Sequence, residues 1–177
     1  MSKAILVTGS SRGIGAKTAI RLAADGYDIC VNYVHDATAA ENVVREVRSR
    51  GRSALAVQAD VSKERDVQSL FARIDEYFDG LYGLVNNAGI LFKQMRVEEM
   101  TAERINAVLT TNVTGYFLCA REAIKRMSQN REGMGGVIVN VSSAAARIGS
   151  AGEYVDYAAS KGAIDTMTIG LANEVAA

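Results

Sequence analysis

The chain has 177 residues, which is the length of about one domain on the usual prior of ~100–200 residues. Its 20 Lys and Arg residues balance its 20 Asp and Glu residues, so the net charge does not favour nucleic acid or an anionic membrane as a partner. Its 49% hydrophobic content excludes wholesale disorder, and two isolated cysteines and a single histidine give no basis for a disulfide framework or a metal site.

The remaining composition favours a cytoplasmic protein. Cys30 and Cys119 are typical of buried thiols in a reduced compartment. No apolar stretch is long enough to span a membrane, and the apolar run near the start is too short for a secretory signal. We therefore expect a single cytoplasmic domain over residues 1–177.

Short, continuous apolar runs recur along the chain and predict strands that are buried on both faces. The segments between them have helical period. Strict alternation of strand and helix predicts an α/β fold, a doubly wound parallel sheet of strand order 3-2-1-4-5 with helices on both faces. The expected strands are 4–7, 29–31, 54–57, 84–85 and 137–139, and the expected helices are 14–24, 38–50, 63–77, 102–127 and 154–175.

A glycine-rich segment follows the first expected strand and opens the first helix. Residues 8–15 read TGSSRGIG. Glycines there allow a sharp turn and let a pyrophosphate approach backbone N–H groups, and the helix N-terminus behind them favours negative charge. The spacing is wider than the GxGxxG of other dinucleotide-binding folds. A plain turn between strand and helix is the alternative.

Tyr157 and Lys161 are four residues apart on an expected helix, so their side chains share one face. An ammonium beside a phenol stabilises the phenolate, and such a tyrosine can act as a general acid or base near neutral pH. Read alone, the pair is equally compatible with a solvated helix face.

Polar side chains follow two of the expected strands. Residues 140–143 read NVSS and residues 86–89 read NNAG. Open α/β sheets bind ligands at the carboxyl ends of their strands, where the two serine hydroxyls can bind a substrate oxygen and the asparagines can lock adjacent loops. Plain turns are the alternative for both segments.

Together the TGxxxGxG, NNAG and YxxxK patterns resemble the short-chain dehydrogenase/reductase family. The resemblance covers the whole chain and is closest to the bacterial branch of glucose dehydrogenases and 3-oxoacyl-carrier-protein reductases. It implies a Rossmann fold and an oxidoreductase that moves a hydride between a nicotinamide cofactor and a carbonyl or secondary alcohol. It also implies a small-molecule substrate and a homotetramer formed through the helices expected at 102–127 and 154–175.

The resemblance assigns four catalytic residues. Tyr157 matches the general acid/base, and Lys161 matches the lysine that activates it and holds the nicotinamide ribose. Ser143 matches the serine that orients the substrate carbonyl, with one extra residue inferred in the loop before Tyr157. Ser142 is the alternative. Asn112 matches the asparagine whose backbone holds a water in the proton relay.

The expected cofactor is NADP(H) rather than NAD(H). NAD-preferring members carry an acid at the end of the second strand, and no acid occupies residues 31–35 here. Arg12 lies where NADP-preferring members place a cation, and a guanidinium suits a phosphate. The cofactor-binding residues implied by the resemblance are Thr8, Gly9, Ser11, Arg12, Gly13, Ile14, Gly15, Asn32, Asp60, Val61, Asn86, Ala88, Gly89, Tyr157 and Lys161.

Two expectations concern completeness and activity. Family members continue beyond the helix that carries Tyr157 into further strands and a substrate-covering lid, so we expect this chain to be a portion of a longer product. The alternative to an enzyme is a non-catalytic nucleotide-binding relative that serves as a sensor or subunit. It predicts loss of Tyr157, Lys161 or Ser143, and all three are present.

Overall fold

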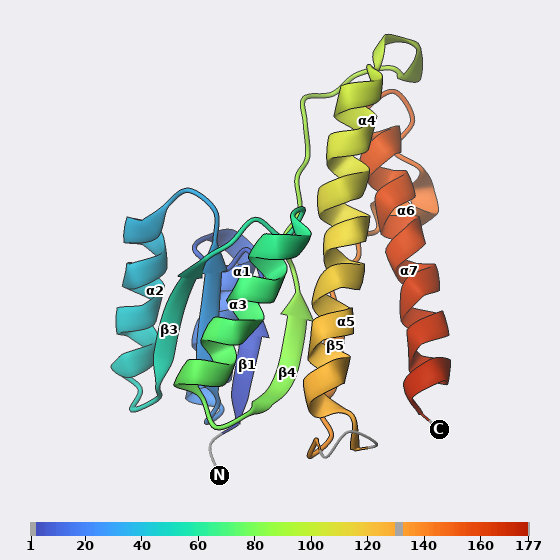
Figure 1. Ribbon diagram of the computed structural model, residues 1–177. Helices are drawn as coiled ribbons and strands as arrows, with labels where there is room; N and C mark the ends of the chain where they lie inside the picture. The colour runs from blue at the N-terminus through green and yellow to red at the C-terminus, as the bar shows by residue number, and fades with distance from the viewer. Residues whose placement is uncertain (1–2, 130–132, 177) are drawn as a thin grey trace.

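The computed structural model describes residues 3–129 and 133–176. Its centre is a five-stranded sheet in the order β3-β2-β1-β4-β5 (Figure 1). Every neighbouring pair of strands is parallel, which confirms the predicted doubly wound fold and its strand order. The strands are β1 (Ala4–Val7), β2 (Asp28–Tyr33), β3 (Ala54–Gln58), β4 (Leu81–Asn86) and β5 (Val137–Asn140).

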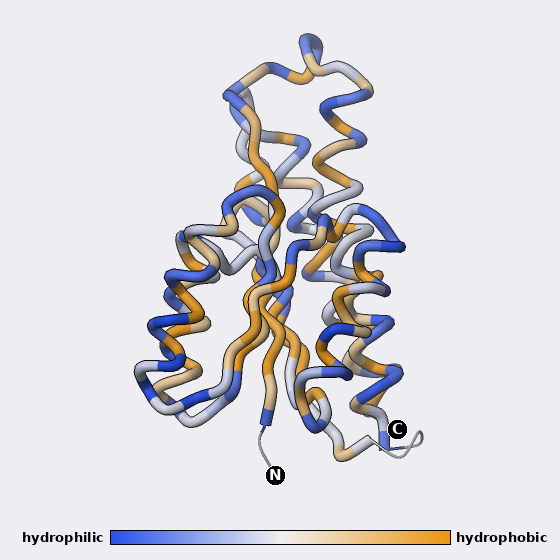
Figure 2. The backbone as a smooth tube through the Cα atoms, turned by 60° about the vertical axis from the view of Figure 1, so that its left-hand side comes forward, coloured by the Kyte–Doolittle hydropathy of each residue, from blue (hydrophilic) through white to orange (hydrophobic). Residues whose placement is uncertain are grey.

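Helices cover both faces of the sheet, as predicted. On one face, α1 (Gly13–Ala24) and α2 (Ala37–Arg48) pack on β1, β2 and β3. On the other face, α3 (Glu64–Tyr77), α5 (Gly115–Met127) and α7 (Val155–Val175) enclose a second apolar cluster. Figure 2 shows the strands as orange segments at the centre and the helices as alternating orange and blue turns. Helices such as α2 and α3 bury an apolar stripe and expose a polar one.

The helix expected over 102–127 forms with those bounds, but it contains a π-helical turn that was not predicted. The segment divides into α4 (Ala102–Leu109), a π-helical turn η2 (Thr110–Thr114) and α5. The apolar spacing cannot reveal this turn, because it adds a residue to the helix without ending it. Figure 1 shows α4 continuing the line of α5 beyond the carboxyl ends of the strands, beside the start of α7. Two short helices were also not predicted, η1 (Val97–Glu99) and α6 (Ala145–Ile148).

The prediction that every strand is buried on both faces is wrong for β5. Val137 and Val139 are 45% and 48% exposed, whereas Ile138 packs against the apolar cluster of α3, α5 and α7. Side chains of a strand alternate between faces, and α1 and α2 lie over the other end of the sheet. Within residues 3–129 and 133–176, no helix is both long enough and apolar enough to cross a membrane.

Candidate active site

The glycine-rich loop joins β1 to α1 at the carboxyl edge of the sheet. Gly9 has φ +61°, in the left-handed region that favours glycine. A Cβ atom on Gly9 would lie 2.9 Å from Ala88 Cα, and one on Gly15 would lie 2.5 Å from Asn87 Nδ2. These two glycines therefore let the loop pack directly on the segment that follows β4.

Thr8 and Asn87 fasten the loop to that segment. Thr8 Oγ1 accepts hydrogen bonds from the backbone N–H groups of Asn87 (2.9 Å) and Ala88 (3.0 Å). Asn87 Nδ2 donates to the carbonyl oxygens of Thr8 (2.8 Å) and Gly9 (3.2 Å). The loop-locking role expected for asparagines after β4 thus falls to Asn87, which the cofactor-binding set omitted.

Asn32 holds the other side of the loop. Its side chain is buried, and Oδ1 accepts a 3.0 Å hydrogen bond from Gly9 N–H. Its Nδ2 donates to the carbonyl of Ala59 (2.9 Å), just beyond β3. The amide therefore joins the loop to the ends of β2 and β3. Its predicted contact with a cofactor remains a prediction.

The first turn of α1 fits an anionic group. Arg12 is the N-cap residue and makes no side-chain capping hydrogen bond, and Gly13 and Ile14 beside it are exposed. A Cβ atom on Gly13 would meet no atom within 4 Å. The first N–H groups of a helix have no partners inside the helix, and they carry the positive end of its dipole. This opening, with half-buried Ser11 at its edge, fits the pyrophosphate of a dinucleotide cofactor.

Asp60 and Val61 follow β3 at the same edge. Asp60 Oδ1 accepts hydrogen bonds from the N–H (3.0 Å) and Oγ (2.7 Å) of Ser62. Burial alone would raise the pKa of Asp60, but these bonds and the Lys63 ammonium outweigh it, so the pKa lies below its usual value. Val61 is buried, and a Cβ atom on Gly115 would lie 3.0 Å from its Cγ2. Val61 thus packs where η2 ends and α5 begins.

The tyrosine–lysine pair lies on the buried side of α7. Lys161 is 3% exposed, and its Nζ lies 5.8 Å from the centroid of the Tyr157 ring. Nζ donates to the carbonyl oxygen of Val141 (2.6 Å), just after β5. Burial lowers the pKa of Lys161 to about 8, although nearby Asp165 opposes the shift. The solvated-face alternative does not apply to Lys161.

The two serines after β5 make different contacts. Ser142 Oγ donates to the carbonyl oxygen of Lys161 at 3.4 Å. Ser143 Oγ accepts from the N–H of Ala145 at 3.2 Å, at the start of α6. A hydroxyl that accepts one hydrogen bond can still donate its own proton. The contacts therefore favour Ser143 as the donor to a substrate oxygen.

Asn112 connects three elements around the site. It is fully buried in η2, and its Oδ1 accepts from Ile90 N–H at 2.8 Å. Its Nδ2 donates to Ile90 O (3.1 Å) and Ser160 Oγ (3.2 Å). A Cβ atom on Gly89 would lie 3.3 Å from Asn112 Oδ1, so glycine suits this close approach. The relay role of the Asn112 backbone remains a prediction, although π-helical turns are frequent at functional sites.

Asn86, the last residue of β4, links that strand to α5 and β5. Its Nδ2 donates to the carbonyl of Tyr116 (3.3 Å) and to Asn140 Oδ1 (3.0 Å). Asn140 Nδ2 in turn donates to Thr168 Oγ1 at 3.0 Å. This chain of amides joins β4, β5 and α7, so the strands and the helix that carries Tyr157 are held in one arrangement.

A buried ion pair that the sequence does not reveal anchors the start of α7. Arg104 Nε lies 2.8 Å from Asp156 Oδ2, and Arg104 Nη1 donates to the carbonyl of Lys93 at 2.8 Å. Asp156 Oδ1 accepts from the N–H of Tyr157 at 2.9 Å. Burial alone would raise the pKa of Asp156, but Arg104 and that N–H outweigh it and hold the pKa below its usual value. The pair fixes the backbone that carries Tyr157.

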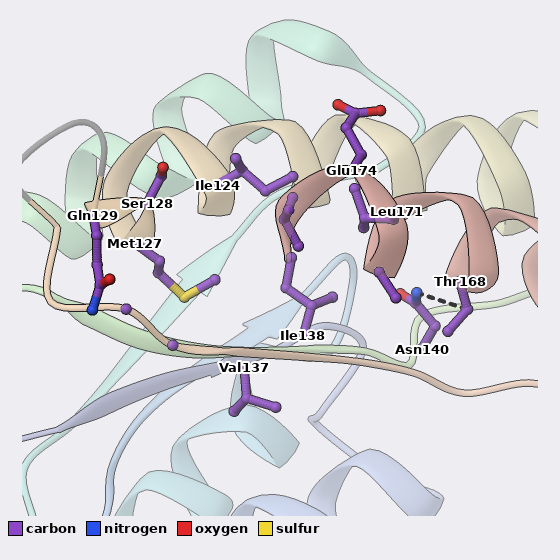
Figure 3. Close-up of a pocket in the computed structure, with 14 residues that line it drawn as sticks. Ile124, Met127, Ser128, Gln129, Val137, Ile138, Asn140, Thr168, Leu171 and Glu174 are labelled. Carbon is purple, nitrogen blue, oxygen red and sulfur yellow. Dashed lines mark hydrogen bonds between the residues drawn. The ribbon is translucent and has the colours of Figure 1, made fainter. Parts of the chain in front are cut away.

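A separate cavity of about 660 Å³ lies between α5, α7 and β5, away from the glycine-rich loop. Figure 3 shows Ile138 pointing toward the two helices and Val137 pointing to the opposite face of the sheet. Apolar side chains such as Met127 and Leu171 line most of the cavity, and the Asn140–Thr168 hydrogen bond crosses one end. Neither Tyr157 nor Lys161 lines it, so it is distinct from the candidate active site.

The model of one protein family, described as short chain dehydrogenase, matches residues 3–177. The chain belongs to this family. The membership agrees with the glycine-rich loop, the asparagines after β4 and the tyrosine–lysine pair that the structure gathers at one edge of the sheet.

Several curated proteins are similar to this one along nearly all of the chain. The uncharacterized oxidoreductase YgfF of Escherichia coli is 60% identical over 172 residues, which cover 97% of this chain and 70% of that protein. A 3-oxoacyl-[acyl-carrier-protein] reductase of Synechocystis is 39% identical, covering 97% of this chain and 67% of the relative. The 3-oxoacyl-[acyl-carrier-protein] reductase FabG of Staphylococcus aureus is 36% identical, covering 99% of this chain and 70% of the relative. These names agree with an oxidoreductase family.

Proposed function

We propose that the protein interconverts a ketone and a secondary alcohol with NADP(H) as cofactor. The observation that carries this proposal is the buried ammonium of Lys161. Its Nζ lies 5.8 Å from the centroid of the Tyr157 ring and is hydrogen-bonded to Val141, just after β5. A neighbouring positive charge favours the phenolate form of a tyrosine, which is what a general acid/base near neutral pH requires.

In reduction, the Tyr157 phenol donates its proton to the carbonyl oxygen, and in oxidation the phenolate removes the proton of the alcohol. Ser143 donates a hydrogen bond to that oxygen and so orients the substrate. Lys161 stabilises the phenolate, and the Asn112 backbone connects the lysine to solvent through water. The bound nicotinamide cofactor supplies or takes up the hydride at the carbonyl carbon.

Two contacts support NADP(H) over NAD(H). The first acid after β2 is Asp36, and its Oδ1 accepts a 2.8 Å hydrogen bond from Ala39 N–H as the N-cap of α2. Arg12 lies two residues from Ser10, whose N–H donates to the carbonyl of Asn32 at 2.8 Å. Arg12 is exposed two residues from that contact, and a guanidinium suits a 2′-phosphate.

The direct test uses the purified protein, NADPH or NADH, and a panel of carbonyl compounds. The panel includes a 3-oxoacyl thioester, because two of the relatives are named as 3-oxoacyl reductases. We expect cofactor oxidation that depends on the carbonyl compound and is faster with NADPH. Tight binding of NADPH without turnover across the panel would favour the sensor or subunit alternative.

Ser143→Ala should lower the turnover number about tenfold, whereas Ser142→Ala should change it less than about twofold, on the usual scale of one hydrogen bond. The reason is that Ser143 keeps a proton to donate, while the Ser142 hydroxyl donates to Lys161. Steady-state kinetics of the two variants make the comparison. The reverse order would move the substrate-orienting role to Ser142.

We also propose a cytoplasmic homotetramer. Apolar side chains on the helices expected to pair between copies are exposed, among them Leu109, Phe117 and Ile169. Exposed apolar side chains that gather on one surface indicate an interaction site, and closed homo-oligomers reuse the same surface on both sides. Sedimentation velocity at micromolar concentration should give a tetramer, and a monomer would contradict the proposal.

A further inference from the structure

We propose that Tyr116 is a positioning residue for Lys161. The phenol oxygen of Tyr116 accepts a hydrogen bond from the Lys161 ammonium and so holds that ammonium beside Tyr157. The proposal rests on the function proposed for Tyr157 and Lys161. Tyr116 belongs to α5 and lies 45 residues before Lys161. The cofactor and catalytic residues assigned above do not include it.

The contact is direct and buried. Lys161 Nζ lies 3.1 Å from Tyr116 Oη, and Tyr116 is only 1% exposed. The ammonium also lies 4.9 Å from the centroid of the Tyr116 ring. A charge taken out of water needs hydrogen-bonding partners, and Tyr116 supplies one of them.

The direction of the phenol proton fixes which group donates. Tyr116 Oη donates to the carbonyl oxygen of Val141 at 3.2 Å, so its lone pairs are available to Lys161. The same carbonyl accepts from Lys161 Nζ at 2.6 Å. An ammonium has three N–H groups, and these two contacts account for two of them. The third remains for the reacting groups at the site.

Burial keeps Tyr116 a neutral acceptor. Burial, with smaller contributions from Tyr157 and Cys119, raises the pKa of Tyr116 well above its usual value. Around Lys161, the titratable groups are Tyr157 and Asp165 from α7 and Tyr116 from α5, and the segment after β5 contributes the uncharged carbonyl of Val141. The neutral phenol therefore favours the ammonium without neutralising it.

Tyr116→Phe isolates this hydrogen bond, because phenylalanine keeps the ring over the ammonium and removes only the oxygen. The ammonium should become less favourable, and the Tyr157 phenolate with it. We expect the acidic limb of the pH profile for alcohol oxidation to move to higher pH by about 0.5–1 unit. The turnover number at neutral pH should fall about three- to tenfold, with the KM for the alcohol within about twofold of the parent.

The matched control is Tyr82→Phe, which makes the same change on β4, where the ring stacks on Tyr27. Its pH profile should coincide with that of the parent. Thermal unfolding of both variants shows whether they are folded. An unchanged acidic limb in a folded Tyr116→Phe protein, or an equal shift in Tyr82→Phe, would overturn the proposal.

A second measurement does not depend on turnover. Nuclear magnetic resonance titration of the labelled Lys161 side chain, with Lys161→Arg to assign the signal, should give a lower pKa for Lys161 in Tyr116→Phe than in the parent. An equal pKa in the two proteins would contradict the proposal. If the pKa falls but no carbonyl compound is reduced by the parent, the hydrogen bond stands and the proposed function fails.

Discussion

Replacing Tyr157 with Phe should lower the turnover number for ketone reduction about a hundredfold or more, which is the usual scale for a positioned general acid. The phenylalanine ring occupies the same space on α7, and only the group that transfers the proton is lost. The contacts of Lys161 with Val141 and Tyr116 do not involve Tyr157, so the ammonium should stay in place. Steady-state kinetics with saturating NADPH measure the effect.

Binding of NADPH provides the internal check on Tyr157→Phe. Fluorescence titration should give a dissociation constant within about threefold of the parent, because the glycine-rich loop is unchanged. Tyr77→Phe makes the same change at an exposed position on α3 and should retain full activity. If Tyr157→Phe reduces a carbonyl substrate as fast as the parent, Tyr157 is not the general acid.

Replacing Arg12 with Ala should raise the KM for NADPH about ten- to hundredfold, the scale of one charge-assisted hydrogen bond of about 1.5–3 kcal/mol. The KM for NADH should change little, because NADH lacks the 2′-phosphate. Arg12 makes no capping hydrogen bond to α1, so its removal should leave the helix intact. Kinetics with both cofactors at a fixed carbonyl concentration separate the two effects.

Arg21→Ala is the control for Arg12→Ala. Arg21 is an exposed arginine at the other end of α1, where it pairs with Asp25 at 3.0 Å. Its loss should leave both KM values unchanged. Equal weakening of NADPH and NADH by Arg12→Ala would mean that Arg12 only shapes the loop, and a parent enzyme that prefers NADH would overturn the cofactor assignment.

Local patterns predicted most of the sheet. Runs such as residues 4–7 are short, apolar and followed by turn residues, so the strand, the glycine-rich loop and α1 follow from adjacent residues. The parallel order then follows from alternation with helices. β5 is different, because the exposure of Val137 and Val139 depends on which helices cover that end of the sheet.

Contacts between distant residues could not be predicted. The Arg104–Asp156 ion pair spans 52 residues, and the Lys161–Tyr116 hydrogen bond spans 45. Neither arginine nor tyrosine has a spacing pattern that marks such a partner. The π-helical turn around Asn112 is hidden for a related reason, since a helix pattern averages over the one turn that departs from it.

The buried amide of Asn32 restricts how coenzyme preference can be redesigned. A carboxylate introduced to attract the ribose of NAD could be placed at several positions near the end of β2. At position 32 it would replace a side chain that is only 1% exposed. A carboxylate there would also lack the N–H donor that Asn32 offers to the carbonyl oxygen of Ala59. His35, three residues further on, is exposed. Mutant libraries for a changed coenzyme should therefore vary position 35 and its exposed neighbours and keep Asn32.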